Sequence, residues 1–199
     1  MKVDLTKTLN FTISDVWQRV ESMPEDPPDS QVYVMETESC QGFFIVFPVG
    51  IEQTMPFDNP QAVIEGIHNT LADDQALIEV HSENTGQSRI IYSIIKTHQE
   101  PAEVQYTLTL NAATDKEAFH LQGFFDEVGM TGMRDSVVYE MKRKEGSVSD
   151  GLVGWMADPY DKDFHRQYMM NLSEREEYDS MFPEHPLSVA RQFVREIHV

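Results

Sequence analysis

Residues 88–145 decide the fold, because three sheet-forming segments there run directly into one amphipathic helix. The segments are SRIIYSIIKT at 88–97, EVQYTLTLNA at 103–112 and KEAFHLQGFFDEV at 116–128. After them, apolar residues recur at intervals of three and four: Met130, Met133, Val137, Val138 and Met141. Alternation followed by a period near 3.6 is typical of an antiparallel meander whose open face is covered by a helix.

The residues upstream of this meander predict two more helices and three more strands. One helix is expected over residues 12–22, where Ile13, Val16, Trp17 and Val20 share a face. QVYVMETE at 31–38 and FFIVFPV at 43–49 are typical of two antiparallel strands. Asn59 followed by Pro60 predicts the start of the second helix, and ALIEVH at 76–81 predicts a short strand.

The C-terminal third differs in character from the rest of the chain. GSVSDGLVG at 146–154 predicts a flexible joint. Ser173 with Glu176 matches a capping box, which predicts a helix ending before Pro183. Pro186 begins another helix, whose apolar side is Leu187, Val189, Ala190, Phe193, Val194 and Ile197. We therefore expect an α+β domain over residues 1–145 and a helical C-terminal extension over residues 146–199 packed on it.

The order of elements resembles a known fold. Helix, two strands, helix, strand, meander and helix, over residues 11–145, is similar to the fold shared by the PsbP proteins of photosynthesis and the Ran-binding protein Mog. Residues 119–125 followed by 129–134 are the most suggestive piece. The resemblance implies a mainly antiparallel sheet sandwiched between helices. It implies no functional residue, because the functions of that family are diverse.

A second resemblance points to the helix-grip fold of the START-like proteins. Ile13-Ser14-Asp15-Val16-Trp17 is similar to the opening helix of those proteins. They also need a long C-terminal helix that closes a deep ligand cavity. Here the final third is interrupted by Gly151, Gly154, Pro159, Pro183 and Pro186. The PsbP/Mog-like fold is therefore preferred, with the START-like fold as the alternative.

Composition restricts the class of partner. The 199 residues are 40% hydrophobic, which is enough for one packed core. Asp and Glu outnumber Lys and Arg by 34 to 15, for a net charge of −19, and residues 21–87 contain no Lys or Arg. Such a field repels phosphate backbones and anionic headgroups, so nucleic-acid and membrane partners are disfavoured. The acidic surface either suits a basic partner or serves solubility alone.

Cysteine usage and the N-terminus favour a reducing, cytoplasmic setting. Cys40 is the single cysteine, so no intrachain disulfide can form. The first residues, MKVDLTKTLNFTISD, lack the apolar core of a secretion signal. Glu36 and Glu38 flank Cys40 and disfavour its thiolate, so a nucleophilic role is not expected.

No sequence motif predicts a catalytic centre, a metal or a cofactor. The seven histidines are scattered, and no two of them lie three or four residues apart. No GxSxG, phosphate loop or GxGxxG is present. Gly129-x-x-Gly132 is too short to cradle a phosphate, and it predicts a turn between the sheet and the following helix. Arg134, at the start of the helix after the meander, either binds an anion there or pairs with Asp126 or Glu127 and pins the helix to the sheet.

The remaining candidates are aromatic and methionine residues of the C-terminal segment, which adapt well to protein surfaces. The candidate interaction residues are Trp155, Tyr160, Phe164, Tyr168, Met181 and Phe182. They either bind a partner protein or a second copy, or they pack on their own domain. We predict a non-enzymatic cytoplasmic binding or adaptor protein. The alternative is a small-molecule-binding protein or an enzyme with a pocket between sheet and helices, near Tyr92, Tyr106, His120 and Arg134.

Overall fold

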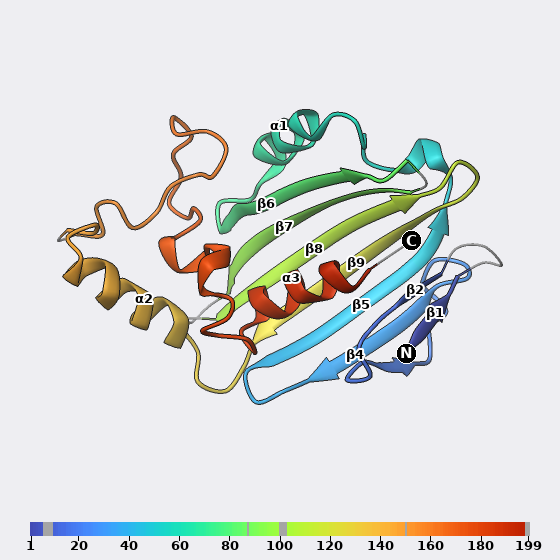
Figure 1. The fold of residues 1–199 in the computed structure, drawn as a ribbon, viewed down its shortest axis with the longest axis horizontal. Helices are drawn as coiled ribbons and strands as arrows, with labels where there is room; N and C mark the ends of the chain where they lie inside the picture. The colour runs from blue at the N-terminus through green and yellow to red at the C-terminus, as the bar shows by residue number, and fades with distance from the viewer. Residues whose placement is uncertain (6–9, 87, 100–102, 150, 198–199) are drawn as a thin grey trace.

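A seven-stranded antiparallel sheet forms the centre of the molecule (Figure 1). The computed structural model describes residues 1–5, 10–86, 88–99, 103–149 and 151–197. The strand order is β3-β4-β5-β9-β8-β7-β6. The strands are β3 (Gln18–Val20), β4 (Gln31–Glu36), β5 (Cys40–Val49), β6 (Gln75–Asn84), β7 (Arg89–Gln99), β8 (Glu103–Ala113) and β9 (Ala118–Glu127). A separate pair, β1 (Lys2–Asp4) and β2 (Asn10–Thr12), lies beside one end of the sheet.

The expected meander is confirmed as β7, β8 and β9. Tyr92 lies opposite Leu110, and Leu110 lies opposite Leu121, so these side chains share one face. Successive residues of a strand point to opposite faces. Ile91, the neighbour of Tyr92, accordingly belongs to a different apolar cluster.

Helices cover both faces of the sheet. α3 (Pro186–Glu196) lies over β5, β8 and β9, and its Leu187 and Phe193 join the cluster that contains Tyr92. α1 (Pro60–Thr70) packs against β6, and its Val63 joins the cluster that contains Ile91 on the other face. Both helices begin where the sequence predicts. The Asn59 side chain accepts a hydrogen bond from the Ala62 backbone N–H, and Pro186 occupies the first turn of α3.

The principal core lies between the sheet and α3. Phe193 packs against Phe44 with ring centroids 4.8 Å apart and against Trp17 at 5.1 Å. The apolar side predicted for α3 is confirmed at Leu187, Ala190, Phe193, Val194 and Ile197, which are all buried. A segment that ends the chain thus supplies the largest contribution of any helix to the main core.

Residues 12–22 do not form the expected helix. Thr12 ends β2, and Gln18–Val20 is the edge strand β3 paired with β4. Ile13 and Trp17 are buried, whereas Val16 is 55% exposed, so the four residues predicted to share one apolar face do not point the same way. β-Branched residues favour extended backbone, and pairing with β4 decides the conformation. The START-like alternative loses its opening helix by the same finding.

The helix after the meander was expected to cover the open face of the sheet, and this expectation was wrong. α2 (Met133–Lys144) projects from one end of the sheet, and α3 covers the face in its place (Figure 1). Of its predicted apolar stripe, Val138 is fully buried, but Met130 is 72% exposed and Met133 is 46% exposed.

The capping box predicted at Ser173 lies two residues earlier. Asn171 accepts a hydrogen bond from the Ser173 backbone N–H, and the Glu174 carboxylate accepts one from the Asn171 backbone N–H. No α-helix follows. The chain forms two short 3-10 helices, η2 (Leu172–Glu174) and η3 (Glu176–Tyr178), because its side chains are held by buried ionic contacts described below.

The fold is therefore α+β, a mainly antiparallel sheet sandwiched between helices, as the sequence predicts. One further 3-10 helix, η1 (Ile51–Gln53), precedes α1. None of the helices in the described residues is long and apolar enough to cross a lipid bilayer. The division into a domain at 1–145 and an extension at 146–199 stays a prediction.

Candidate functional site

A buried ion pair ties the C-terminal segment to the sheet. Lys96 of β7 and Glu174 of η2 lie 2.8 Å apart, Nζ to Oε2, and both are at least 98% buried. The Tyr106 hydroxyl donates to Glu174 Oε1 at 2.8 Å. Burial, followed by the negative charge of Glu174, raises the pKa of Tyr106 well above its usual value, so it remains a neutral donor. Two partners on the sheet thus fix a single carboxylate of the segment.

Arg134 holds the start of α2 against the same segment. Its guanidinium donates to Ser173 O at 2.7 Å, Ser188 Oγ at 2.8 Å and Asp179 Oδ1 at 3.1 Å. It also donates to Arg175 O, and its fifth N–H points at His185 Nδ1 at 3.5 Å. Pairing with Asp126 or Glu127 was the expectation, and the partner is Asp179 instead. The side chain is 1% exposed, and its five donors all have protein acceptors, which leaves none for a bound anion.

Arg191 of α3 extends this network to the sheet. It binds Glu79 Oε2 through Nε at 2.7 Å and Asp179 Oδ1 through Nη1 at 3.2 Å. Burial opposes its charge, but Glu79 and Asp179 raise the pKa of Arg191 above the ordinary value. The Tyr92 hydroxyl donates to the other oxygen of Glu79 at 2.5 Å. These contacts are structural, since each charged group is occupied by another residue of the chain.

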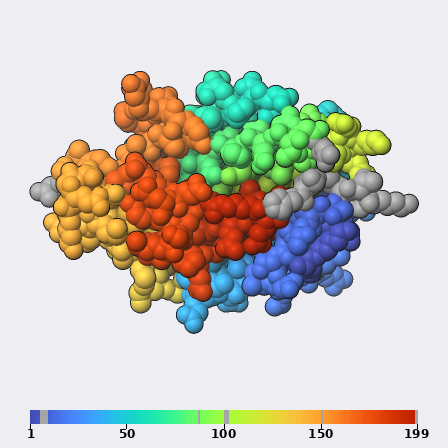
Figure 2. Space-filling view, in the orientation of Figure 1, coloured from blue at the N-terminus to red at the C-terminus, as the bar shows by residue number. Residues whose placement is uncertain are grey.

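The most distinctive surface feature is a groove beside this network, at the end of β9, which we call the methionine groove. It has a volume of about 510 Å³ and lies where three chain segments meet (Figure 2). Its lining residues are Glu38, Ser39, Glu127, Met130, Met133, Arg134, Phe182, Pro183, Glu184 and His185. Most of its wall is apolar. The β4–β5 turn, the end of β9 and residues 182–185 each bring one carboxylate to it, namely Glu38, Glu127 and Glu184.

Two glycines shape the groove. Gly129 has φ of +71°, and a Cβ there would lie 2.6 Å from the carbonyl oxygen of Glu38, so only glycine lets the β9–α2 turn approach the β4–β5 turn. Gly132 has φ of +72° and begins α2, and its N–H donates to Glu127 Oε1 at 3.0 Å. The pair was expected to form a turn between sheet and helix, and it does so.

Burial determines the charge states inside the groove. Desolvation, followed by the positive charges of Arg134, Arg191 and Lys96, lowers the pKa of His185 to about 3. His185 is therefore neutral at neutral pH, with Nδ1 accepting from the Leu187 N–H at 3.3 Å. Burial also raises the pKa of Glu127 above its ordinary value. The groove thus presents a neutral imidazole and a poorly solvated carboxylate.

The lowered pKa of His185 predicts acid sensitivity. The unfolded chain protonates this histidine near pH 6.5, whereas the folded protein does not, so the unfolded state binds the extra proton and stability falls as pH falls. Between about pH 7 and about pH 5 we expect this residue to remove about 2 kcal/mol from the free energy of unfolding. Urea unfolding at both pH values should show that loss in the wild type and not in H185N, which keeps a capping acceptor. H165N, at an exposed histidine, is the control; an unchanged loss in H185N would contradict the prediction.

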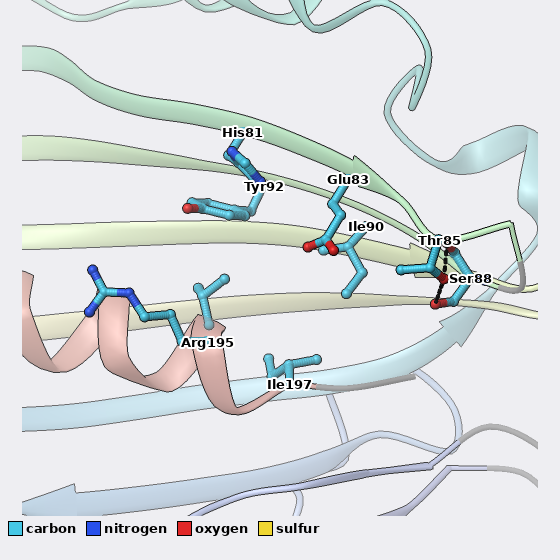
Figure 3. Close-up of a pocket in the computed structure, with 9 residues that line it drawn as sticks. His81, Glu83, Thr85, Ser88, Ile90, Tyr92, Arg195 and Ile197 are labelled. Carbon is cyan, nitrogen blue, oxygen red and sulfur yellow. Dashed lines mark hydrogen bonds between the residues drawn. The ribbon is translucent and has the colours of Figure 1, made fainter.

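A second groove, of about 250 Å³, lies between the end of α3 and strands β6 and β7 (Figure 3). His81 and Glu83 enter it from β6, and Tyr92 enters from β7. The one cation at its rim, Arg195, pairs instead with Glu176 through Nη2 at 2.6 Å. The two aliphatic hydroxyls among the described residues that line it, those of Thr85 and Ser88, hydrogen-bond to each other at 3.1 Å.

Five of the six predicted interaction residues contact their own chain, and Phe182 does so through the cluster of Val138, Trp155 and Tyr178. Trp155 is buried with its ring edge-on to Tyr139, Phe164 stacks on His68 at 4.2 Å, and Tyr168 stacks on His98 at 4.1 Å. The Tyr160 hydroxyl bonds both backbone groups of Val80, which covers the edge of β6. Met181 is 51% exposed, and Phe182 lines the methionine groove.

The residues suggested for an internal pocket do not lie together. Tyr92 and Tyr106 are on the α3 face with their hydroxyls bonded to Glu79 and Glu174, whereas His120 packs against Phe47. Asn111, opposite His120, neighbours Leu110 of the α3 face, so His120 belongs to the other face. Among the described residues, the α3 face is a packed core at its centre, and Tyr92 at its β6–β7 edge lines the groove of about 250 Å³.

The sequence predicts neither a nucleophilic thiol nor a metal site. Cys40 is fully buried, and burial followed by Asp126 raises the pKa of its thiol to about 12, so the thiolate does not form at neutral pH. Among the described residues, no three His, Cys, Asp or Glu side chains group as metal ligands. His198 lies outside the described residues.

Sequence reasoning did not find the methionine groove, although it identified Arg134 and Phe182, two of the groove's lining residues. Met130 and Met133 were assigned to a buried stripe, and Glu38 and Glu184 come from distant segments that no sequence spacing connects. No spacing in the sequence marked the groove, because Met133 and Val137 are four residues apart and share a helix face wherever the helix packs.

No family model matches the sequence, and neither does any curated protein. Solved structures of similar fold include a mutant of the protein Mog1, with 11% identity and a TM-score of 0.47, covering 100% of this chain and 95% of that chain. Another is the Saccharomyces cerevisiae Ran-binding protein Mog1p, with 10% identity and a TM-score of 0.46, covering 100% and 94%. The likeness concerns the fold, and neither structure is a PsbP protein. The function is argued from the site of this chain.

Proposed function

We propose that this protein is a non-enzymatic binding module that takes up a segment of a partner protein in the methionine groove. The observation that carries the proposal is the exposure of two methionines, 72% for Met130 and 46% for Met133, at the rim of a groove whose far wall is Phe182. Methionine is flexible and polarisable, and it suits surfaces that adapt to a partner. Binding of a partner removes this apolar area from water, which contributes a favourable free energy of about 25 cal/mol per Å².

Charge at the groove indicates the chemistry of the partner. Glu38, Glu127 and Glu184 reach it, and its one cationic side chain, Arg134, is buried and fully bonded. Electrostatic complementarity therefore favours a segment that carries basic residues among apolar ones. A second copy of this chain would bring a net charge of −19, so a homodimer through this surface is disfavoured.

The packing of the α3 face also supports a binding role over the alternative of an internal pocket. Tyr92 and Tyr106 have hydrogen-bonded hydroxyls, and the described residues at the centre of the space between sheet and α3 are packed side chains, with a groove of about 250 Å³ at the β6–β7 edge. The absence of nucleic-acid or membrane partners is part of the proposal and rests on the acidic composition. A cytoplasmic location is also part of it and rests on the single cysteine, Cys40.

Removing the two methionines should abolish partner capture. Tagged wild type, M130Q/M133Q and M23Q would be used as baits in the native host; Met23 is 70% exposed and lies far from the groove, so M23Q is the matched control. Each truncated apolar contact at an interface costs about 1–2 kcal/mol, so the two changes cost about 2–4 kcal/mol, and calorimetry on the recovered partner should show about 30- to 1,000-fold weaker binding for the double variant.

Three results would contradict the proposal. Retention of the same partner at the same affinity by the double variant would put the binding surface elsewhere. The captured protein could be a second copy of this chain, which light scattering would reveal as a dimer. A small molecule bound to the purified protein, found by native mass spectrometry, would favour the pocket alternative.

A further inference from the structure

The methionine groove contains a carboxylate, Glu127, that no charged group of the described residues contacts, although the charge of Arg134 acts on it from a greater distance. Glu127 is 7% exposed and lines the groove. Its Oε1 accepts a hydrogen bond from the Gly132 N–H, and the described residues supply none to Oε2. The one basic nitrogen of the described residues within 4.0 Å is His185 Nε2, at 3.9 Å from Oε1.

His185 does not provide the missing charge. Burial lowers its pKa to about 3, so at neutral pH the imidazole is uncharged. Arg134 lines the same groove, but its five donors point at Ser173, Ser188, Arg175, Asp179 and His185, and none of them at Glu127. A buried carboxylate without a counter-charge is unfavourable, and a cation entering the groove relieves that cost.

The walls around this carboxylate suit a long aliphatic chain. Met133, Phe182 and Pro183 are apolar, and the volume of about 510 Å³ accommodates a long side chain together with its neighbours. Lysine buries its methylene stem along apolar surface and keeps a compact ammonium at the tip. Since Oε1 is already bonded to Gly132, Glu127 offers one oxygen, which matches the point charge of an ammonium better than the two-pronged guanidinium of arginine.

We infer that the groove recognises a lysine side chain of the partner segment, with its ammonium on Glu127 Oε2 and its methylene stem against Met133 and Phe182. This inference rests on the proposed function and names what that site selects. The preference for apolar residues then comes from the methionines, and the preference for a cation comes from Glu127.

The test uses peptides selected from a random displayed library against the full chain. Each selected peptide is remade with lysine replaced by norleucine, which keeps the stem and removes the ammonium. Binding is measured to wild type, E127Q and E83Q. E127Q keeps the acceptor for Gly132, and E83Q removes a charge from β6 roughly 25 Å away, at about 3.3 Å per residue along the strands.

We expect selected peptides to carry lysine among apolar residues. Norleucine in the peptide or E127Q in the protein should each weaken binding by about 10-fold to 100-fold, and the two changes together should cost little more than either alone. E83Q should bind as wild type does.

Two further outcomes separate the inference from the proposed function. If peptides bind wild type, lose affinity for M130Q/M133Q and are indifferent to norleucine and E127Q, the groove binds protein and the lysine inference is wrong. If no selected peptide depends on Met130 and Met133, the proposed function fails and the inference fails with it. Equal melting temperatures of wild type and E127Q would show that the readout reflects binding and not folding.

Discussion

A chain that ends at Gly146 will not fold to a stable monomer. The missing residues include α3, whose Leu187, Phe193, Val194 and Ile197 lie in the main core. Burial of four large apolar side chains contributes roughly 6–12 kcal/mol, which is of the order of the whole stability of a domain. Without α3, Trp17, Phe44 and Phe125 would face water.

Circular dichroism, calorimetry and gel filtration of the shortened chain would measure this effect. F193A in the full chain is the graded control: it should remain folded and lose about 3–5 kcal/mol, as expected for a large aromatic removed from a core. M181Q, at an exposed position outside the core, should change little. If the shortened chain keeps its melting temperature, solubility and oligomeric state, the C-terminal segment anchors nothing and the prediction is wrong.

Replacing Glu174 by glutamine should be the most damaging single change of a polar residue. Glutamine keeps the size of the side chain but leaves the Lys96 ammonium buried without its counter-charge. Its amide NH2 would also face the Asn171 backbone N–H, so that two donors meet. Breaking a buried pair by removing one partner costs about 3–5 kcal/mol. Chemical denaturation of E174Q against wild type measures it.

The control for that prediction is the double variant K96M/E174Q. Methionine removes the uncompensated charge and fills similar space, so a large part of the lost stability should return. E176Q, at an exposed carboxylate of the same segment, should cost less than about 1 kcal/mol. Equal stabilities of E174Q and E176Q would show that the Lys96–Glu174 contact does not hold the segment in place.

Parts of the candidate site followed from local sequence. The Gly129 and Gly132 turn was predicted, and both glycines adopt the left-handed backbone that the turn requires. Arg134 and Phe182 were identified as candidates, but the surroundings of Arg134 were not, because Asp179 and Ser188 lie 45 and 54 residues from it in the chain. Met130 and Met133 fit a helical stripe equally well whether α2 lies on the sheet or beyond its end. Periodicity identifies a potential contact face and cannot name what covers it.

The sequence by itself determined β4 to β9, the meander among them, α1 and α3, because alternation, capping and proline position act over a few residues. Asn59 and Pro186 begin their helices wherever the helices finally pack. Tertiary structure decided the rest. Residues 12–22 are extended because β4 offers an edge to pair with, and α2 leaves the sheet because α3 occupies its face. The methionine groove exists only where the β4–β5 turn, the β9–α2 turn and residues 182–185 meet, and such long-range meetings depend on the packing of the whole chain.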